Sequence, residues 1–112
     1  MRTLIAAAAA FLILVPPASG HSLLRTELYR TDPCLARIID RENPSWNPRQ
    51  YNLQGSGAYG RPQALPGWKM QSAGADWRTN PYTQLKWAAK YVRERYGGSC
   101  AAWAFWQRHH YY

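Results

Sequence analysis

The residue best placed to do chemistry is Glu42, a carboxylate on the apolar side of an expected helix. It follows Leu35 by seven residues and Ile38 by four, so the three side chains share one helical face. Burial raises the pKa of a carboxyl group, because the charged form loses its solvation. A carboxyl group that keeps its proton near neutral pH can act as a general acid. The alternative is an ordinary helix-end glutamate that pairs with Arg41 or points to solvent.

A helix from Pro33 to Glu42 is needed to position this carboxylate. Asp32 is a favourable N-cap, and proline suits the first helical position. Pro44 disfavours helical backbone at Asn43, so the helix is expected to end there. Glu42 is therefore expected in the last turn, beside a segment without regular structure.

Two further helices are expected in the C-terminal part of the chain. The first is capped by Asn80, opens at Pro81 and ends before Gly97 and Gly98. The second covers Ser99–Gln107, is rich in alanine and tryptophan, and is expected to be short and buried.

The middle of the chain, residues 43–80, is rich in Pro, Gly, Asn and Ser and has no sustained periodicity. Residues 51–59 carry a weak hairpin pattern, and Leu65–Gly67 predicts a turn. The expected fold class is therefore mainly α-helical: one small domain with a turn-rich middle.

The N-terminus has the order of a secretory signal peptide. Arg2 is followed by the apolar run Leu4–Val15, two prolines and the small residues Ala18–Gly20. The run is shorter than the roughly 20 residues that span a bilayer. We expect a signal peptide over residues 1–20 and a secreted domain over 21–112. An uncleaved membrane anchor or a buried helix is the alternative.

Export changes the interpretation of the cysteines and of the charge. Cys34 and Cys100 are the only two cysteines, and in an oxidising compartment they are expected to pair. Their spacing does not suit a zinc site. The chain has 14 Lys and Arg against 6 Asp and Glu. Outside the membrane this positive charge would attract anionic cell-wall polymers rather than nucleic acid.

Four sequence blocks occur in a fixed order over residues 38–107. They read IIDRENPSWNP, GAYGRPQALPG and ADWRTNPYTQL, with a closing set of Tyr91, Arg95–Gly97, Cys100, Trp103 and Gln107. In order and spacing they resemble the lytic transglycosylase (SLT-type) domain of the lysozyme-like superfamily. The resemblance covers most of the chain after residue 33 and implies a lysozyme-like helical fold.

The resemblance implies roles for individual residues. Glu42 matches the catalytic glutamate, which would protonate the glycosidic oxygen between N-acetylmuramic acid and N-acetylglucosamine. The same carboxylate would then accept the proton of the muramic C6 hydroxyl, which attacks C1 and gives a 1,6-anhydro product. Gln63 would bind substrate and Tyr59 would line the groove, or they are a loop amide and a core aromatic. The loop that lets backbone approach the sugar matches Gly57, Ala58 and Gly60.

A hydrolase would need a second carboxylate at a defined separation from the first. Asp76 is the candidate, although an aspartate there also suits a turn cap or a pair with Arg78. The sequence departs from the family pattern at three places, one of which is a residue added at Pro44–Ser45 before Trp46. Asn43 replaces a serine, which alters a hydrogen bond that orients Glu42, and Arg61 replaces a leucine and would face anionic substrate or solvent.

The resemblance thus implies a monomeric enzyme that acts on peptidoglycan glycan strands in the cell wall, without a metal or a cofactor. Two readings of the same fold compete with it: a muramidase, which hydrolyses the bond, and a cell-wall-binding module without turnover. A membrane-active or nucleic-acid-binding basic protein is a third alternative, which export and the ordered blocks disfavour.

Overall fold

The computed structural model describes residues 20–52 and 56–112, and their secondary structure is mainly helical, as predicted. The expected signal segment, except for Gly20, and the tip of the expected hairpin lie outside the described residues. Among those residues, no helix combines the length and apolar character that a membrane span needs. The elements are α2 (Gly20–Thr31), α3 (Pro33–Glu42), the 3-10 helix η1 (Gly67–Ala73), α4 (Pro81–Tyr96) and α5 (Ser99–His109).

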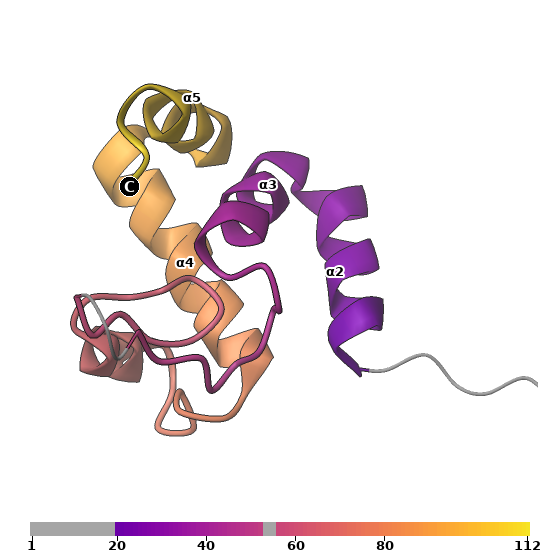
Figure 1. The fold of residues 1–112 in the computed structure, drawn as a ribbon, viewed down its shortest axis with the longest axis vertical. Helices are drawn as coiled ribbons and strands as arrows, with labels where there is room; N and C mark the ends of the chain where they lie inside the picture. Colours follow the sequence, from indigo (N-terminus) through magenta and orange to yellow (C-terminus); the bar gives the residue numbers. More distant parts are fainter. Residues whose placement is uncertain (1–19, 53–55) are drawn as a thin grey trace, which may run out of the picture.

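Helix α3 has the predicted bounds and the predicted cap. The Asp32 carboxylate accepts a hydrogen bond from the backbone N–H of Leu35 at 3.2 Å, and the helix ends at Glu42. The apolar face is fully buried, because it packs against α2 on one side and α5 on the other. Figure 1 shows α3 between α2 and the α4–α5 pair. Glu42 is thus held at the end of a buried helix.

Helices α4 and α5 also begin where the sequence predicts. The Asn80 side chain accepts a hydrogen bond from the backbone N–H of Tyr82 at 2.9 Å, and Gly97 closes α4 in the left-handed conformation at φ 86°. Helix α5 runs to His109, two residues beyond the predicted end. The expectation that α5 is buried is wrong, because Ala102 is its one buried residue and the helix covers α3 and α4 with one face.

The predicted disulfide is present and joins the starts of two helices. Cys34 in the first turn of α3 is bonded to Cys100 in the first turn of α5. Beside it, the Ser99 hydroxyl donates to the Asp32 carboxylate at 2.7 Å. A cross-link over a separation of 66 residues contributes about 4 kcal/mol in the chain-entropy model.

Helix α2 is not predicted from the sequence. Its stability depends on contacts that are distant in sequence, which periodicity does not reveal. Arg25 donates two hydrogen bonds to Asp40 of α3, at 3.0 and 2.9 Å, and Tyr29 donates to the same carboxylate. Leu24 is buried, and Leu28 packs against the core.

The middle of the chain forms turns, as predicted, and η1. Its two isolated β-bridges, Tyr51 with Tyr59 and Tyr59 with Ala64, are the strand pairing found within the described residues. Figure 1 shows this segment beside the N-terminal half of α4, while α5 lies across the other end. The middle segment and α3 thus meet at the end of α3, where Glu42 lies.

Candidate active site

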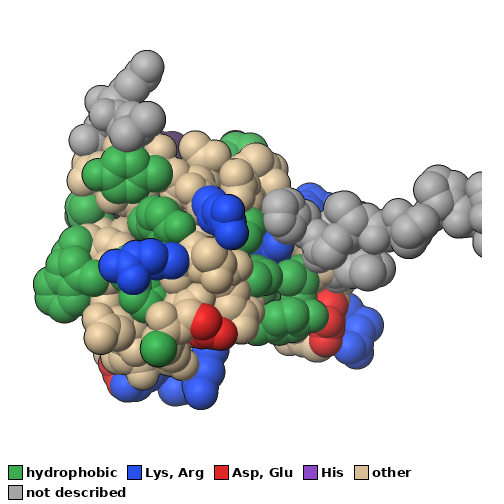
Figure 2. All heavy atoms as spheres, turned by 90° about the horizontal axis from the view of Figure 1, so that it is seen from below, with side chains coloured by type: hydrophobic (Ala, Val, Ile, Leu, Met, Phe, Trp, Pro, Cys, Tyr) green, Lys and Arg blue, Asp and Glu red, His purple; other side chains and the backbone are tan. Residues whose placement is uncertain are grey.

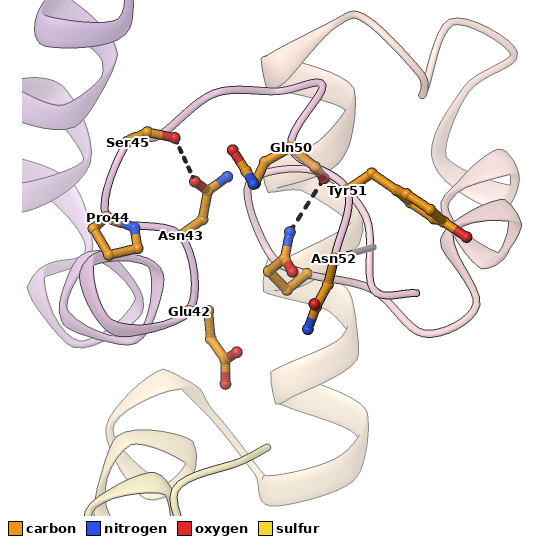
Figure 3. A pocket seen from close by; sticks show the side chains of 8 residues that line it. Glu42, Asn43, Pro44, Ser45, Gln50, Tyr51 and Asn52 are labelled. Carbon is orange, nitrogen blue, oxygen red and sulfur yellow. Dashed lines mark hydrogen bonds between the residues drawn. The ribbon is translucent and has the colours of Figure 1, made fainter. Parts of the chain in front are cut away.

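A cleft of about 580 Å³ opens at the end of α3, within the usual size of ligand-binding pockets. It lies between the turn that follows α3 and the segment around residues 50–52 (Figure 3). Glu42 is the one acidic residue among the described residues that line it. The lining residues are Glu42, Asn43, Pro44, Ser45, Gln50, Tyr51, Asn52 and Gln63.

The Glu42 carboxylate is half-buried and points away from the turn that follows α3 (Figure 3). Its Oε1 accepts a hydrogen bond from Nε1 of Trp106 at 2.8 Å. Burial raises the pKa of Glu42, and the Trp106 bond lowers it only in part, so the net shift is upward. Within the described part of the chain, no ion pair forms with Arg41, whose guanidinium lies over the Trp106 ring. This carboxyl group can therefore hold a proton at higher pH than an ordinary glutamate.

Trp106 is a site residue that the sequence reasoning missed. Its ring stacks on Trp103 with 5.7 Å between centroids and meets the edge of His110 at 5.1 Å. These contacts fix the direction of the indole N–H toward Glu42. The sequence shows only an aromatic-rich helix, and the contact spans 64 residues of chain, so no local pattern points to it.

Asn43 does not orient Glu42 but joins the two walls of the cleft. It is buried, and its Nδ2 donates to the carbonyl oxygens of Asn47 at 2.9 Å and Gly60 at 3.1 Å. Its Oδ1 accepts from the Ser45 hydroxyl at 2.8 Å. The expectation that Asn43 alters a hydrogen bond to Glu42 finds no support in these contacts. Asn43 instead ties the end of α3 to the segment Gly57–Gly60, which we call the glycine loop.

Gly57, Ala58 and Gly60 do not line the cleft. Gly57 and Gly60 have positive φ, 79° and 77°, and Ala58 is buried. A Cβ at Gly60 would lie 2.9 Å from the side-chain amide of Gln84. The structure thus gives a different reason for glycine than close approach to a sugar: room for Gln84 and the left-handed backbone.

Gln84 is a second residue that the sequence analysis did not single out. It is completely buried, and its Nε2 donates to the carbonyl oxygens of Pro48 and Trp77, both at 2.7 Å. Its Oε1 accepts from the backbone N–H of Arg61 at 2.9 Å. Gln84 therefore fixes the glycine loop from behind.

Gln63 lines the cleft and also stabilises the loop. Its Nε2 donates to the carbonyl oxygens of Gly60 at 2.9 Å and Gln50 at 3.2 Å. Because Nε2 serves the loop, Oε1 is the atom through which Gln63 can accept a hydrogen bond from a ligand.

Of the two roles expected for Tyr59, groove lining and core aromatic, the structure has the second: Tyr59 packs against the core and does not line the cleft. Its hydroxyl donates to the carbonyl oxygen of Arg78 at 2.6 Å, and its ring meets Trp77 edge-on at 5.6 Å. The bridges on both sides of Tyr59 turn its side chain toward Trp77 and η1. Tyr51 supplies the aromatic side chain of the cleft instead.

Asp76 is not brought to the cleft. Its carboxylate accepts from the hydroxyl of Thr83 at 2.6 Å and from the amide of Asn80 at 2.7 Å. These hydrogen bonds, first that of Thr83, lower the pKa of Asp76. Asp76 thus braces the start of α4, and the cleft retains one carboxylate.

Arg61 faces neither substrate nor solvent, contrary to expectation. Its side chain is completely buried, and its guanidinium nitrogens have no hydrogen-bond partner among the described residues. The guanidinium lies over the Trp46 ring at 5.6 Å. Burial lowers the pKa of Arg61 to about 10, so the group stays charged at neutral pH.

In the described residues, no three His, Cys, Asp or Glu side chains gather where they could hold a metal ion. The arrangement at Glu42 offers acid–base chemistry by one carboxyl group beside polar amides. In comparisons with known proteins, no family model, curated protein or solved structure matches the chain.

Proposed function

We propose that the protein is a secreted enzyme of the lytic transglycosylase type, which cleaves peptidoglycan between N-acetylmuramic acid and N-acetylglucosamine. One observation carries the proposal: a half-buried Glu42 with a raised pKa, oriented by Trp106, is the one carboxylate lining a polar cleft. This is the environment that a general acid requires. The substrate class is inferred from the resemblance of the four sequence blocks to the lytic transglycosylase domain.

The proposed reaction uses Glu42 twice. Its proton goes to the glycosidic oxygen, the bond from C1 to that oxygen breaks, and N-acetylglucosamine leaves with a hydroxyl group. The carboxylate then accepts the proton of the muramic C6 hydroxyl while O6 bonds to C1. Glu42 ends protonated, the product is a 1,6-anhydro sugar, and no water is consumed.

The composition of the cleft supports this route over hydrolysis. Glycosidases that hydrolyse use two carboxyl groups, either about 5 Å or about 6.5–9.5 Å apart. Glu42 has no such partner among the described residues of the cleft, and Asp76 is engaged at the start of α4. A single-carboxylate mechanism is therefore the simpler assignment.

The charge of the chain supports an anionic polymer as the target. The formal net charge is +8, and Figure 2 shows Lys and Arg side chains spread over one face rather than gathered in a patch. A spread of this kind favours diffuse attraction to cell-wall polymers over one defined anion site. The disulfide is compatible with an extracellular protein.

The test is digestion of purified peptidoglycan by the wild type and by Glu42→Gln, with products identified by mass spectrometry. We expect 1,6-anhydro muropeptides from the wild type and a loss of about 10²–10⁴-fold in rate from the variant. Glu94→Gln is the matched control, because Glu94 is exposed on α4 and forms only a surface ion pair with Lys90.

Other products would redirect the assignment. Reducing ends formed by addition of water would identify a muramidase. Binding to peptidoglycan without any product, in both the wild type and Glu42→Gln, would identify a wall-binding module and contradict the proposed enzyme.

A further inference from the structure

A second hollow adjoins the Glu42 cleft, and Gln63 lines both. We call it the annex. Its volume is about 180 Å³, equal to about six water molecules at ~30 Å³ each. That space suits a substituent of a sugar rather than a length of glycan strand. Besides Gln63, the residues that line it include Leu65, Lys69, Trp87, Tyr91 and Tyr112.

The floor of the annex is aromatic. The rings of Trp87 and Tyr91 stack with 4.9 Å between centroids, and Tyr112 meets Tyr91 edge-on at 5.6 Å. The Tyr112 hydroxyl already donates to the carbonyl oxygen of Pro62 at 2.6 Å. This surface therefore favours an apolar group such as a methyl.

Gln63 is the geometric link between the annex and the cleft, because it lines both hollows. A substrate whose scissile bond lies at Glu42 would thus extend a neighbouring substituent past Gln63 toward the annex.

The rim of the annex carries one charge. Lys69 is exposed, is the single charged residue lining the hollow, and makes no ion pair among the described residues. Its backbone is fixed in η1, where its carbonyl accepts from the Ser72 hydroxyl at 3.1 Å. A lysine among the lining residues of an aromatic hollow favours a small ligand that is apolar at one end and anionic at the other.

We infer that the annex binds the acidic lactyl-peptide substituent of muramic acid, with its methyl groups on the aromatic floor and a peptide carboxylate at Lys69. This inference rests on the proposed function. The substituent has the required chemistry, because it begins with lactyl and alanyl methyl groups and continues to a free carboxylate. It also branches from the sugar whose C1 bond would be cleaved.

The kinetic test compares native peptidoglycan with peptidoglycan whose carboxylates have been amidated. Lys69→Met should raise KM about three- to fivefold on the native substrate, the size of an exposed ion pair, without lowering kcat. On the amidated substrate, the KM values of wild type and variant should converge. Lys86→Met on exposed α4 is the matched control, and its KM should change less than twofold on either substrate.

A binding test needs no turnover. The probe is the soluble D-lactyl-L-alanyl-D-glutamate, titrated into ¹⁵N-labelled protein. The indole N–H resonance of Trp87 should shift and that of Trp106 should not, and Lys69→Met should weaken the effect.

The two ideas fail in different ways. Cleavage of peptidoglycan combined with an equal effect of Lys69→Met on both substrates would overturn the annex while the proposed function stands. Absence of cleavage combined with a Trp87 shift would overturn the enzyme and support the annex as a peptide site. Absence of both would overturn both.

Discussion

Two carboxylates of α3 have opposite environments although they are two residues apart. Burial alone would raise the pKa of Asp40, but hydrogen bonds from Arg25, Tyr29 and Trp46 outweigh it and the net shift is downward. Burial raises the pKa of Glu42, and the one hydrogen bond that it accepts within the described residues, from the Trp106 indole N–H, offsets this rise only in part. The same helix therefore carries one carboxylate that stays ionised for structure and one that can hold a proton for chemistry.

Trp106→Phe tests how Glu42 is held. Loss of the indole N–H removes the contact that lowers the pKa of Glu42, so this pKa should rise further. A general acid is active while protonated, and activity is lost as pH rises through its pKa. The alkaline limb of the kcat/KM profile should therefore move to higher pH, and kcat should fall about tenfold as the carboxyl group loses its orientation.

Trp103→Phe is the control for Trp106→Phe. Phenylalanine at this position keeps an aromatic ring stacked on Trp106 and removes an indole N–H that makes no hydrogen bond to Glu42. It should leave the position of the alkaline limb unchanged. An unshifted limb in Trp106→Phe would show that the indole N–H does not influence the acid.

At the scale of elements, hydrogen bonds with Asn43 and Gln84 hold the glycine loop against the end of α3. Gly60→Ala should lower the free energy of unfolding by about 2–3 kcal/mol, since it combines a positive φ with a clash against the hydrogen-bonded amide of Gln84. Urea unfolding followed by circular dichroism measures the change.

Gly97→Ala separates the two causes. Gly97 also has a positive φ, 86°, but a Cβ there would meet nothing within 4 Å. It should cost only about 1 kcal/mol. Equal losses in the two variants would mean that backbone conformation alone explains Gly60 and that the fit against Gln84 is unimportant.

The elements show where sequence reasoning succeeds. Helix caps act on neighbouring residues, so they can be recognised in the sequence. Asp32 and Asn80 correctly predict the starts of α3 and α4, and Gly97 correctly predicts the end of α4. Helix α2 is not predicted, because much of its stabilisation comes from the contacts of Arg25 and Tyr29 with a carboxylate in the next helix. Neighbouring residues predict where a helix begins and ends, whereas the packing of one helix on another depends on residues that are distant in sequence.

At the scale of the whole molecule, the site also combines features that local sequence indicates with contacts between residues that are distant in sequence. The apolar periodicity places Glu42 on the apolar face of α3 but leaves open a solvent-exposed carboxylate or a pair with Arg41; in the structure the carboxyl group is half-buried. No local pattern relates Glu42 to Trp106 or Gly60 to Asn43, since those pairs meet only in the folded chain. The resemblance leaves Tyr59 either in the groove or in the core, and its position depends on the bridges that turn it toward Trp77.

The disulfide should contribute much of the stability of so small a domain. Replacement of Cys34 and Cys100 by alanine should lower the free energy of unfolding by about 2–4 kcal/mol, chiefly because the unfolded chain gains freedom. Urea unfolding of the oxidised wild type and the double variant measures the difference. A change below about 1 kcal/mol would indicate that the Ser99–Asp32 contact and the helix packing already hold the two helix starts together.

The position of this cross-link has a mechanical consequence. The disulfide joins the first turns of α3 and α5, while Glu42 and Trp106 form their hydrogen bond farther along the same two helices. Glu42 follows Cys34 by eight residues, a lever arm of about 12 Å. A rotation of about 5° at the joint would displace the carboxyl group by about 1 Å, enough to slow a reaction up to 10²-fold. Under the proposed function, loosening the joint would thus slow the reaction at Glu42 in molecules that are still folded.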